Sequence, residues 1–232
     1  MVKTGKLIRN ILLLAGSMFL SVAFGDSTVS MALTGVGNGT VVGPAYVNPY
    51  NGTVNNSPTL LICDDFAAES YVGETWKANA ISFADLSANL SNTKWGSLGA
   101  SINLYYEAAW LSDALLAAYA ANDTVKQGQL SYAIWGLFTP SALQYSAGAQ
   151  GWIDQAVAAV TASGFSAAQF NNYVIYTPIA GTAYLGTRAM STPQEFIART
   201  PEGSAIALLL FNLAGMLMFA FVFRRRIKGM SN

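Results

Sequence analysis

An uncharged apolar run near the C-terminus constrains this chain more than any other feature. Residues 204–223 contain no charged side chain, and about 20 such residues form a helix long enough to cross a hydrocarbon core of about 30 Å. Arg224, Arg225, Arg226 and Lys228 follow at once, and basic residues beside a membrane span stay on the cytoplasmic side. The sequence therefore predicts one transmembrane helix with a cytoplasmic C-terminus, and a domain on the opposite side of the membrane.

The N-terminus has the three-part pattern of a secretory signal. Basic residues precede an apolar run over residues 11–24, and small residues stand at positions 23 and 25. An apolar run of this length is short of the roughly 20 residues that a spanning helix needs. We therefore interpret residues 1–25 as a signal peptide, which directs export through the secretion translocon and is removed by signal peptidase.

Charge is distributed unevenly along the chain, although the formal net charge is zero. Between positions 26 and 202, five basic residues stand against all twelve acidic residues of the chain, a net charge of −7. Proteins that bind nucleic acid need basic patches that neutralise phosphates. The acidic middle portion therefore argues against nucleic acid as a partner.

Histidine is absent and Cys63 is the only cysteine. These two facts exclude an internal disulfide, histidine-dependent nucleophilic catalysis and the usual zinc sites. Four nearby carboxylates, Asp64, Asp65, Glu69 and Glu74, leave glycoside cleavage or calcium binding as alternatives, but neighbouring side chains on a strand point to opposite faces. We predict no enzyme activity, no cofactor and no bound metal.

The residues from 26 to 181 carry the patterns of an α+β domain. Residues 27–56 are rich in Gly, Asn, Thr and Val, with turn signals at 35–39 and 48–52, and residues 59–63 and 76–83 are typical of strands. Apolar residues then recur at helical spacing in about three helices, and a further strand follows. The predicted helices cover 102–121, 125–138 and 150–162, and the strand covers 173–177. Residues 182–200 show little apolar periodicity and are predicted to form a stalk.

The C-terminal segment resembles the PEP-CTERM sorting signal. Pro201, Glu202 and Gly203 precede the apolar run and the arginine cluster, in the order found in that signal. The resemblance covers residues 201–228 and implies export, recognition by the membrane protease-transpeptidase exosortase, and delivery to the surface of a Gram-negative cell that makes exopolysaccharide. Gly203 stands where the family has a second proline. The predicted helix is therefore either a temporary membrane segment that exosortase removes or a permanent membrane anchor.

Part of the domain resembles bacterial thioester adhesin domains. The similarity lies in residues 61–65, residues 105–111 and the Ala-Ile-Trp segment that ends at Trp135. In those adhesins a strand cysteine, here Cys63, joins a glutamine four residues before the tryptophan. Ser131 occupies that position and has no carbonyl to form a thioester, and Gln127 lies one helical turn earlier. Cys63 is thus a candidate reactive thiol, with a small buried thiol or intermolecular pairing as alternatives.

Aromatic residues are the last feature that bears on function. Most of the tryptophans and two of the tyrosines fall at core-facing spacing and are expected to pack in the core, with a sugar-stacking platform as the alternative. These residues are Trp76, Trp95, Trp110, Trp135, Trp152, Tyr105 and Tyr106.

The sequence therefore predicts an exported surface protein, structural or adhesive, that associates with exopolysaccharide. The competing hypothesis is a binding module for a glycan or small ligand.

Overall fold

The computed structural model describes residues 27–200. The predicted signal peptide (1–25), sorting motif (Pro201, Glu202, Gly203), transmembrane helix (204–223) and cytoplasmic anchor (Arg224, Arg225, Arg226, Lys228) all lie outside the described residues. Within residues 27–200, no helix combines the length and the hydropathy that crossing a bilayer requires.

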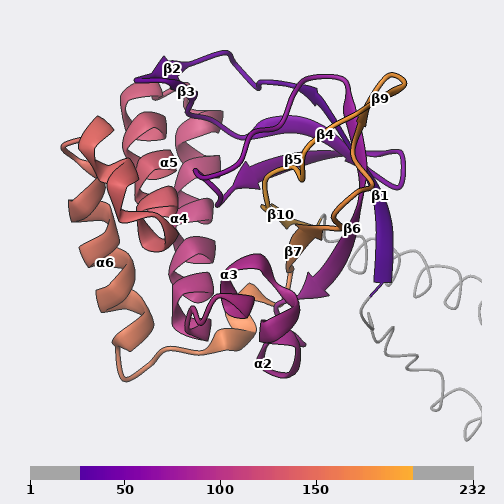
Figure 1. Ribbon diagram of the computed structural model, residues 1–232. Coiled ribbons are helices and arrows are strands. Elements are labelled where there is room, and N and C mark those ends of the chain that lie inside the picture. The colour runs from indigo at the N-terminus through magenta and orange to yellow at the C-terminus, as the bar shows by residue number, and fades with distance from the viewer. Residues whose placement is uncertain (1–26, 201–232) are drawn as a thin grey trace, which may run out of the picture.

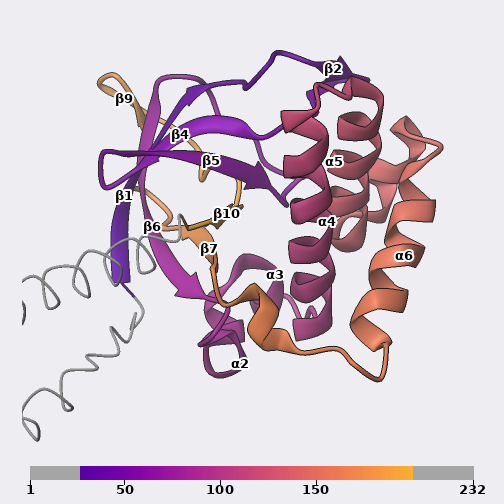
Figure 2. The ribbon, with the colours of Figure 1, turned by 180° about the vertical axis from the view of Figure 1, so that it is seen from behind.

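The described part has two layers, an antiparallel sheet and a group of helices packed on one side of it (Figure 1). The same division is seen from behind in Figure 2. The strands are β1 (Ser27–Gly35), β2 (Val41–Val42), β3 (Ala45–Tyr46), β4 (Tyr50–Val54), β5 (Ser57–Cys63), β6 (Glu74–Ser82), β7 (Tyr173–Pro178), β8 (Tyr184–Leu185), β9 (Arg188–Ala189) and β10 (Phe196–Arg199). The α-helices are α2 (Leu86–Asn89), α3 (Lys94–Ser97), α4 (Ile102–Ala120), α5 (Thr124–Phe138) and α6 (Ala149–Thr161), and short 3₁₀ turns cover Leu90–Asn92, Pro140–Tyr145 and Ala167–Phe170. The predicted α+β class is confirmed.

Six strands pair in the order β1-β4-β5-β10-β7-β6, and β6 pairs again with β1. The sheet therefore closes on itself, and we call these six strands the closed sheet. Every pairing in it is antiparallel. The short hairpin β8–β9 extends from β6, and β2–β3 forms a separate small hairpin. Closure leaves the six strands without a free edge over their paired lengths, which removes a template for edge-to-edge aggregation.

A tight turn and a glycine set the register between β4 and β5. Val54 pairs with Ser57, and the two residues between them, Asn55 and Asn56, have φ of 49° and 67°, as a type I′ hairpin turn requires. Gly52 lies inside β4, where a Cβ would approach the Ala32 carbonyl oxygen to 2.8 Å. The prediction of a turn over 48–52 is therefore wrong, since residues 50–52 belong to β4. Glycine is needed at position 52 because the neighbouring strand lies too close for a side chain.

The helical layer matches the sequence patterns closely. The helices expected over 102–121, 125–138 and 150–162 are α4, α5 and α6, and the strand expected over 173–177 is β7. Asp123 caps α5 by accepting a hydrogen bond from the Lys126 amide at 3.0 Å, and Pro140 follows its end. Each of the seven aromatic residues named in the sequence is buried or packs against the core. Core packing is thus confirmed for them.

The predicted stalk over 182–200 is wrong. Residues 196–199 form β10, which lies in the middle of the closed sheet between β5 and β7. Phe196, Ile197 and Ala198 are fully buried, and the Phe196 ring stacks on Trp76 with a centroid distance of 5.8 Å. The domain therefore extends beyond residue 181 through Arg199, because its sheet is completed by this last strand.

Candidate functional site

The segment after β5 carries the residues that sequence analysis singled out. β5 ends at Cys63, and Asp64 and Asp65 follow at the junction between the closed sheet and the helices. The Cys63 Sγ lies 3.2 Å from the Asp65 carbonyl oxygen and accepts a hydrogen bond from the Asp65 amide at 3.3 Å. Burial, and then the charges of Asp65 and Asp64, raise the pKa of the Cys63 thiol. This environment favours a neutral buried thiol rather than a nucleophilic thiolate.

The structure brings Cys63 and Trp135 together but offers no acyl partner for a thioester. Trp135 is near enough to the Cys63 sulfur to limit the rise of the thiol's pKa, but its indole nitrogen has no hydrogen-bond partner within residues 27–200. Gln127 is fully buried, and its amide is held at the other end of α5: its oxygen accepts from Asn38 Nδ2 at 2.9 Å and its nitrogen donates to the Ala118 carbonyl at 3.3 Å. Ser131 is buried and has no carboxamide. The Cys–Gln chemistry of the adhesin domains is therefore not built into residues 27–200.

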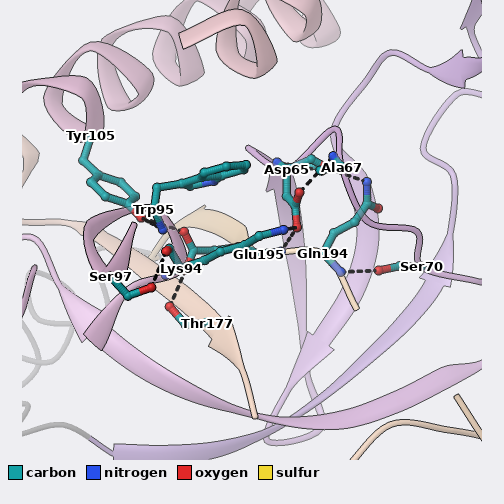
Figure 3. A network of polar contacts seen from close by, with 11 residues as sticks. Asp65, Ala67, Ser70, Lys94, Trp95, Ser97, Tyr105, Thr177, Gln194 and Glu195 are labelled. Carbon is teal, nitrogen blue, oxygen red and sulfur yellow. Dashed lines mark hydrogen bonds and ion pairs between the residues drawn. The ribbon is translucent and has the colours of Figure 1, made fainter. Parts of the chain in front are cut away.

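Three buried carboxylates form the most unusual polar feature of the domain. Asp64, Asp65 and Glu195 are each 0% exposed, and we call them the carboxylate cluster. Figure 3 shows that Lys94 stretches from α3 toward Asp65, with which it forms an ion pair. Sequence analysis grouped Asp64 and Asp65 with Glu69 and Glu74. In the structure, the carboxylate that joins Asp64 and Asp65 is Glu195, which belongs to the segment predicted to be a stalk.

Glu195 is held by hydrogen bonds from three elements. Its carboxylate accepts from the Tyr105 hydroxyl at 2.7 Å, from the Lys94 backbone amide at 2.7 Å and from the Thr177 hydroxyl. Burial raises the pKa of Glu195, and these hydrogen bonds oppose the rise. Burial and the neighbouring Glu195 charge raise the pKa of Tyr105, so its phenol stays a proton donor.

Asp64 holds a proton more readily than an ordinary aspartate. Burial raises its pKa first, followed by the charges of Glu195 and Asp65 and by a hydrogen bond to Glu195. While Asp64 is ionised, neither of its carboxyl oxygens has a hydrogen-bond donor within residues 27–200. The protonated form of Asp64 is therefore favoured, because two buried carboxyl groups close together do not both ionise.

An open cleft of about 440 Å³ lies beside the carboxylate cluster. Its walls contain five aromatic rings, Tyr46, Tyr50, Phe66, Tyr71 and Trp135, together with Glu69, Ser70, Gln194 and smaller apolar residues. We call it the aromatic cleft. Tyr46 and Tyr71 are 42% and 43% exposed, whereas Trp135 forms the buried floor, with the Phe66 ring 5.3 Å away. Rings that are rigid yet accessible suit stacking against an apolar ligand face.

Gln194 connects the cleft to the carboxylate cluster. Its side-chain nitrogen donates to the Asp65 carbonyl at 2.7 Å, and its backbone amide donates to the Ser70 hydroxyl at 3.0 Å. Both contacts are drawn in Figure 3. The tyrosyl hydroxyl of Tyr71 donates to Glu69 on the same wall. The cleft is therefore rigidly joined to the polar network beneath it.

Sequence reasoning missed most of the residues that build these two features. Lys94, Glu195, Tyr46 and Tyr71 were not candidates, because they lie on a four-residue helix, the predicted stalk, a two-residue strand and a loop. The only available signal was the compactness of residues 63–71, where a thiol, carboxylates and aromatic residues occur together. Among the side chains of residues 27–200, no group of three or more His, Cys, Asp or Glu is arranged to hold a metal ion.

Comparison of the chain with protein-family models, curated proteins and solved structures found no match to any of them.

Proposed function

We propose that this chain is an exported cell-surface protein, structural or adhesive in role, that associates with exopolysaccharide through its domain. The support comes from both ends of the sequence: a signal-peptide pattern at 1–25 and, at 201–228, a Pro-Glu dipeptide, an apolar run and an arginine cluster. The partners would be the secretion translocon and signal peptidase, then the membrane and exosortase. The protein would either stay anchored with a cytoplasmic C-terminus or be released to the cell surface.

The aromatic cleft is the observation that carries a binding role for the domain. Its two exposed tyrosines flank an apolar floor, and Glu69, Ser70 and Gln194 supply hydrogen-bonding groups at the wall. Sugar rings present apolar faces and hydroxyl edges, which such a surface matches. Because the domain is acidic, a neutral glycan suits it better than a polyanion. This favours a glycan-binding module over a purely structural protein.

The cleft predicts saturable glycan binding that depends on its tyrosines. We expect Tyr71→Ala and Tyr46→Ala each to weaken binding by about tenfold or more, because each removes an accessible aromatic ring from the wall of the cleft. Titration of the purified domain with neutral and acidic polysaccharides, after an array screen, measures this. Tyr184→Ala is the matched control, since Tyr184 is 44% exposed but lies outside the cleft. Absence of binding, or equal losses in all three variants, contradicts the proposal.

The tail predicts a change of C-terminus that depends on Glu202. If exosortase recognises the Pro-Glu dipeptide, the mature protein ends near residue 202, and Glu202→Ala retains the complete hydrophobic tail in the membrane fraction. Cell fractionation with C-terminal mass spectrometry distinguishes the two. Gly203→Pro, which restores the usual motif, is expected to increase processing because it fixes the backbone φ. Identical termini in the wild type and Glu202→Ala are incompatible with exosortase processing.

A further inference from the structure

The ion pair between Lys94 and Asp65 joins two parts of the chain that lie far apart in the sequence. Lys94 belongs to α3, and Asp65 follows β5. The Asp65 side chain is fully buried, and that of Lys94 is 28% exposed, so water has little access to the contact. The Lys94 ammonium also lies 4.8 Å from the centroid of the Trp95 ring. An ion pair in such a place is costly to desolvate, and a neutral bond between the same atoms removes that cost.

Backbone amides hold the Asp65 carboxyl in a fixed orientation. The Ala67 amide donates to Oδ1 at 3.0 Å, and the Glu195 amide points to Oδ2 at 3.4 Å. Lys94 Nζ contacts the second oxygen, Oδ2. The side-chain carboxyl carbon of Asp65, Cγ, therefore has the Lys94 nitrogen beside Oδ2 and the Ala67 amide as a hydrogen-bond donor to Oδ1. This is the arrangement that an acyl transfer needs, because the donor at Oδ1 stabilises the oxyanion that develops there.

Asp64 and Glu195, the other two members of the carboxylate cluster, are placed to donate and accept protons beside the ion pair. Asp64 is the residue next to Asp65, and burial and the charge of Glu195 raise its pKa and favour its protonated form. The backbone amide of Glu195 contacts Asp65. Glu195 is also fixed by the backbone amide of Lys94. Both the attacking residue, Lys94, and the accepting residue, Asp65, are thus in direct contact with Glu195.

We propose that Lys94 and Asp65 condense spontaneously into an intramolecular isopeptide bond after the domain folds. Proton transfer from the ammonium to the Asp65 carboxylate leaves a neutral amine, which attacks Cγ and forms the C–N bond. The negative charge develops on Oδ1, which the Ala67 amide stabilises. The Asp64–Glu195 pair protonates Oδ2 and receives a proton from the new C–N nitrogen, the Cγ–Oδ2 bond breaks, and one water leaves. The ammonium and the carboxylate together yield one amide and one water, with no oxidant, no reductant and no net change in protons.

The cross-link can be sought in the wild-type protein without any variant. After the purified full-length chain is denatured and digested with chymotrypsin, we expect a branched peptide that joins residues 62–66 to residues 91–95. Its mass is expected to be the sum of the masses of the two linear peptides less one water, the water that is lost when the amide forms. If residues 62–66 and 91–95 are recovered only as linear peptides, the proposal is overturned.

Two pairs of variants separate bond formation from simple structural support. Lys94→Arg keeps the positive charge but cannot form the amide, so only linear peptides are expected; Lys126→Arg, whose ammonium also lies 4.8 Å from a tryptophan ring, is the matched control and should keep the branched product. Glu195→Gln keeps the size of the side chain and should reduce the branched fraction about tenfold or more, since it removes one of the two carboxyl groups placed to donate and accept protons. A Glu195→Gln protein that folds and shows an undiminished branched fraction contradicts this role.

Discussion

A chain that ends after Gly181 is expected to lose its cooperative fold, whereas one that ends after Thr200 should keep it. The shorter chain lacks β10, which lies between β5 and β7 in the closed sheet. It loses Phe196 and Ile197, both fully buried, and burial of each such side chain contributes about 1.5–3 kcal/mol. With the ladder hydrogen bonds on both sides of β10, the loss approaches the 5–15 kcal/mol by which domains are stable.

Thermal unfolding followed by circular dichroism is the measurement for both chains, each starting at residue 27. We expect a cooperative transition for 27–200 and none for 27–181, together with aggregation of the latter, because β5 and β7 then present unpaired edges. A cooperative transition of 27–181 within a few degrees of that of 27–200 would restore the idea of a stalk.

Gly96→Ala is expected to destabilise the domain by about 3 kcal/mol. A Cβ at position 96 would lie 1.9 Å from the Leu90 carbonyl oxygen and 2.6 Å from Thr93 Oγ1. Thr93 caps α3 by accepting from the Gly96 amide at 3.0 Å, and it donates to the Leu90 carbonyl at 2.7 Å. The clash is with backbone, so relief requires α3 to move, and α3 positions Lys94.

The same substitution at position 151 is the control for Gly96→Ala. Gly151 is exposed on α6, and a Cβ there would have no heavy atom within 4 Å. Gly151→Ala should therefore stabilise the domain by about 0.5–1 kcal/mol, through the lower entropy of the unfolded chain. Chemical denaturation gives both free energies of unfolding. If the two variants change the free energy of unfolding in the same direction, steric crowding is not the reason why position 96 is glycine.

The helices were predictable because their information is local. In α4 and α5, apolar residues recur every three or four positions over several turns, and Asn122, Asp123 and Pro140 mark the boundaries. The strand after Asp26 and the one ending at Cys63 were indicated by composition, but their partners were not. β1 pairs with both β4 and β6, and closure of the sheet depends on contacts between residues far apart in the sequence.

The candidate site was predictable only around Cys63. The sequence indicated a buried strand that ends in a thiol and two carboxylates, and the structure bears this out. Glu195 could not be connected to them, because β10 is four residues long and residues 191–195 before it, four polar residues and Pro193, show no strand pattern. The exposed tyrosines of the aromatic cleft were equally hidden, since a two-residue strand and a single loop residue carry no periodicity.

The position of β10 gives the domain a mechanical property. Only Thr200 separates the end of this strand, Arg199, from Pro201, where the predicted anchoring signal begins. Tension on that signal therefore enters the domain through a strand hydrogen-bonded on both sides, to β5 and to β7. A pull along β10 loads its two ladders in shear, so that the hydrogen bonds of both ladders share the force at once, rather than opening one after another. Under the anchoring proposed above, this arrangement is expected to resist separation of the domain from its anchor when flow pulls on it.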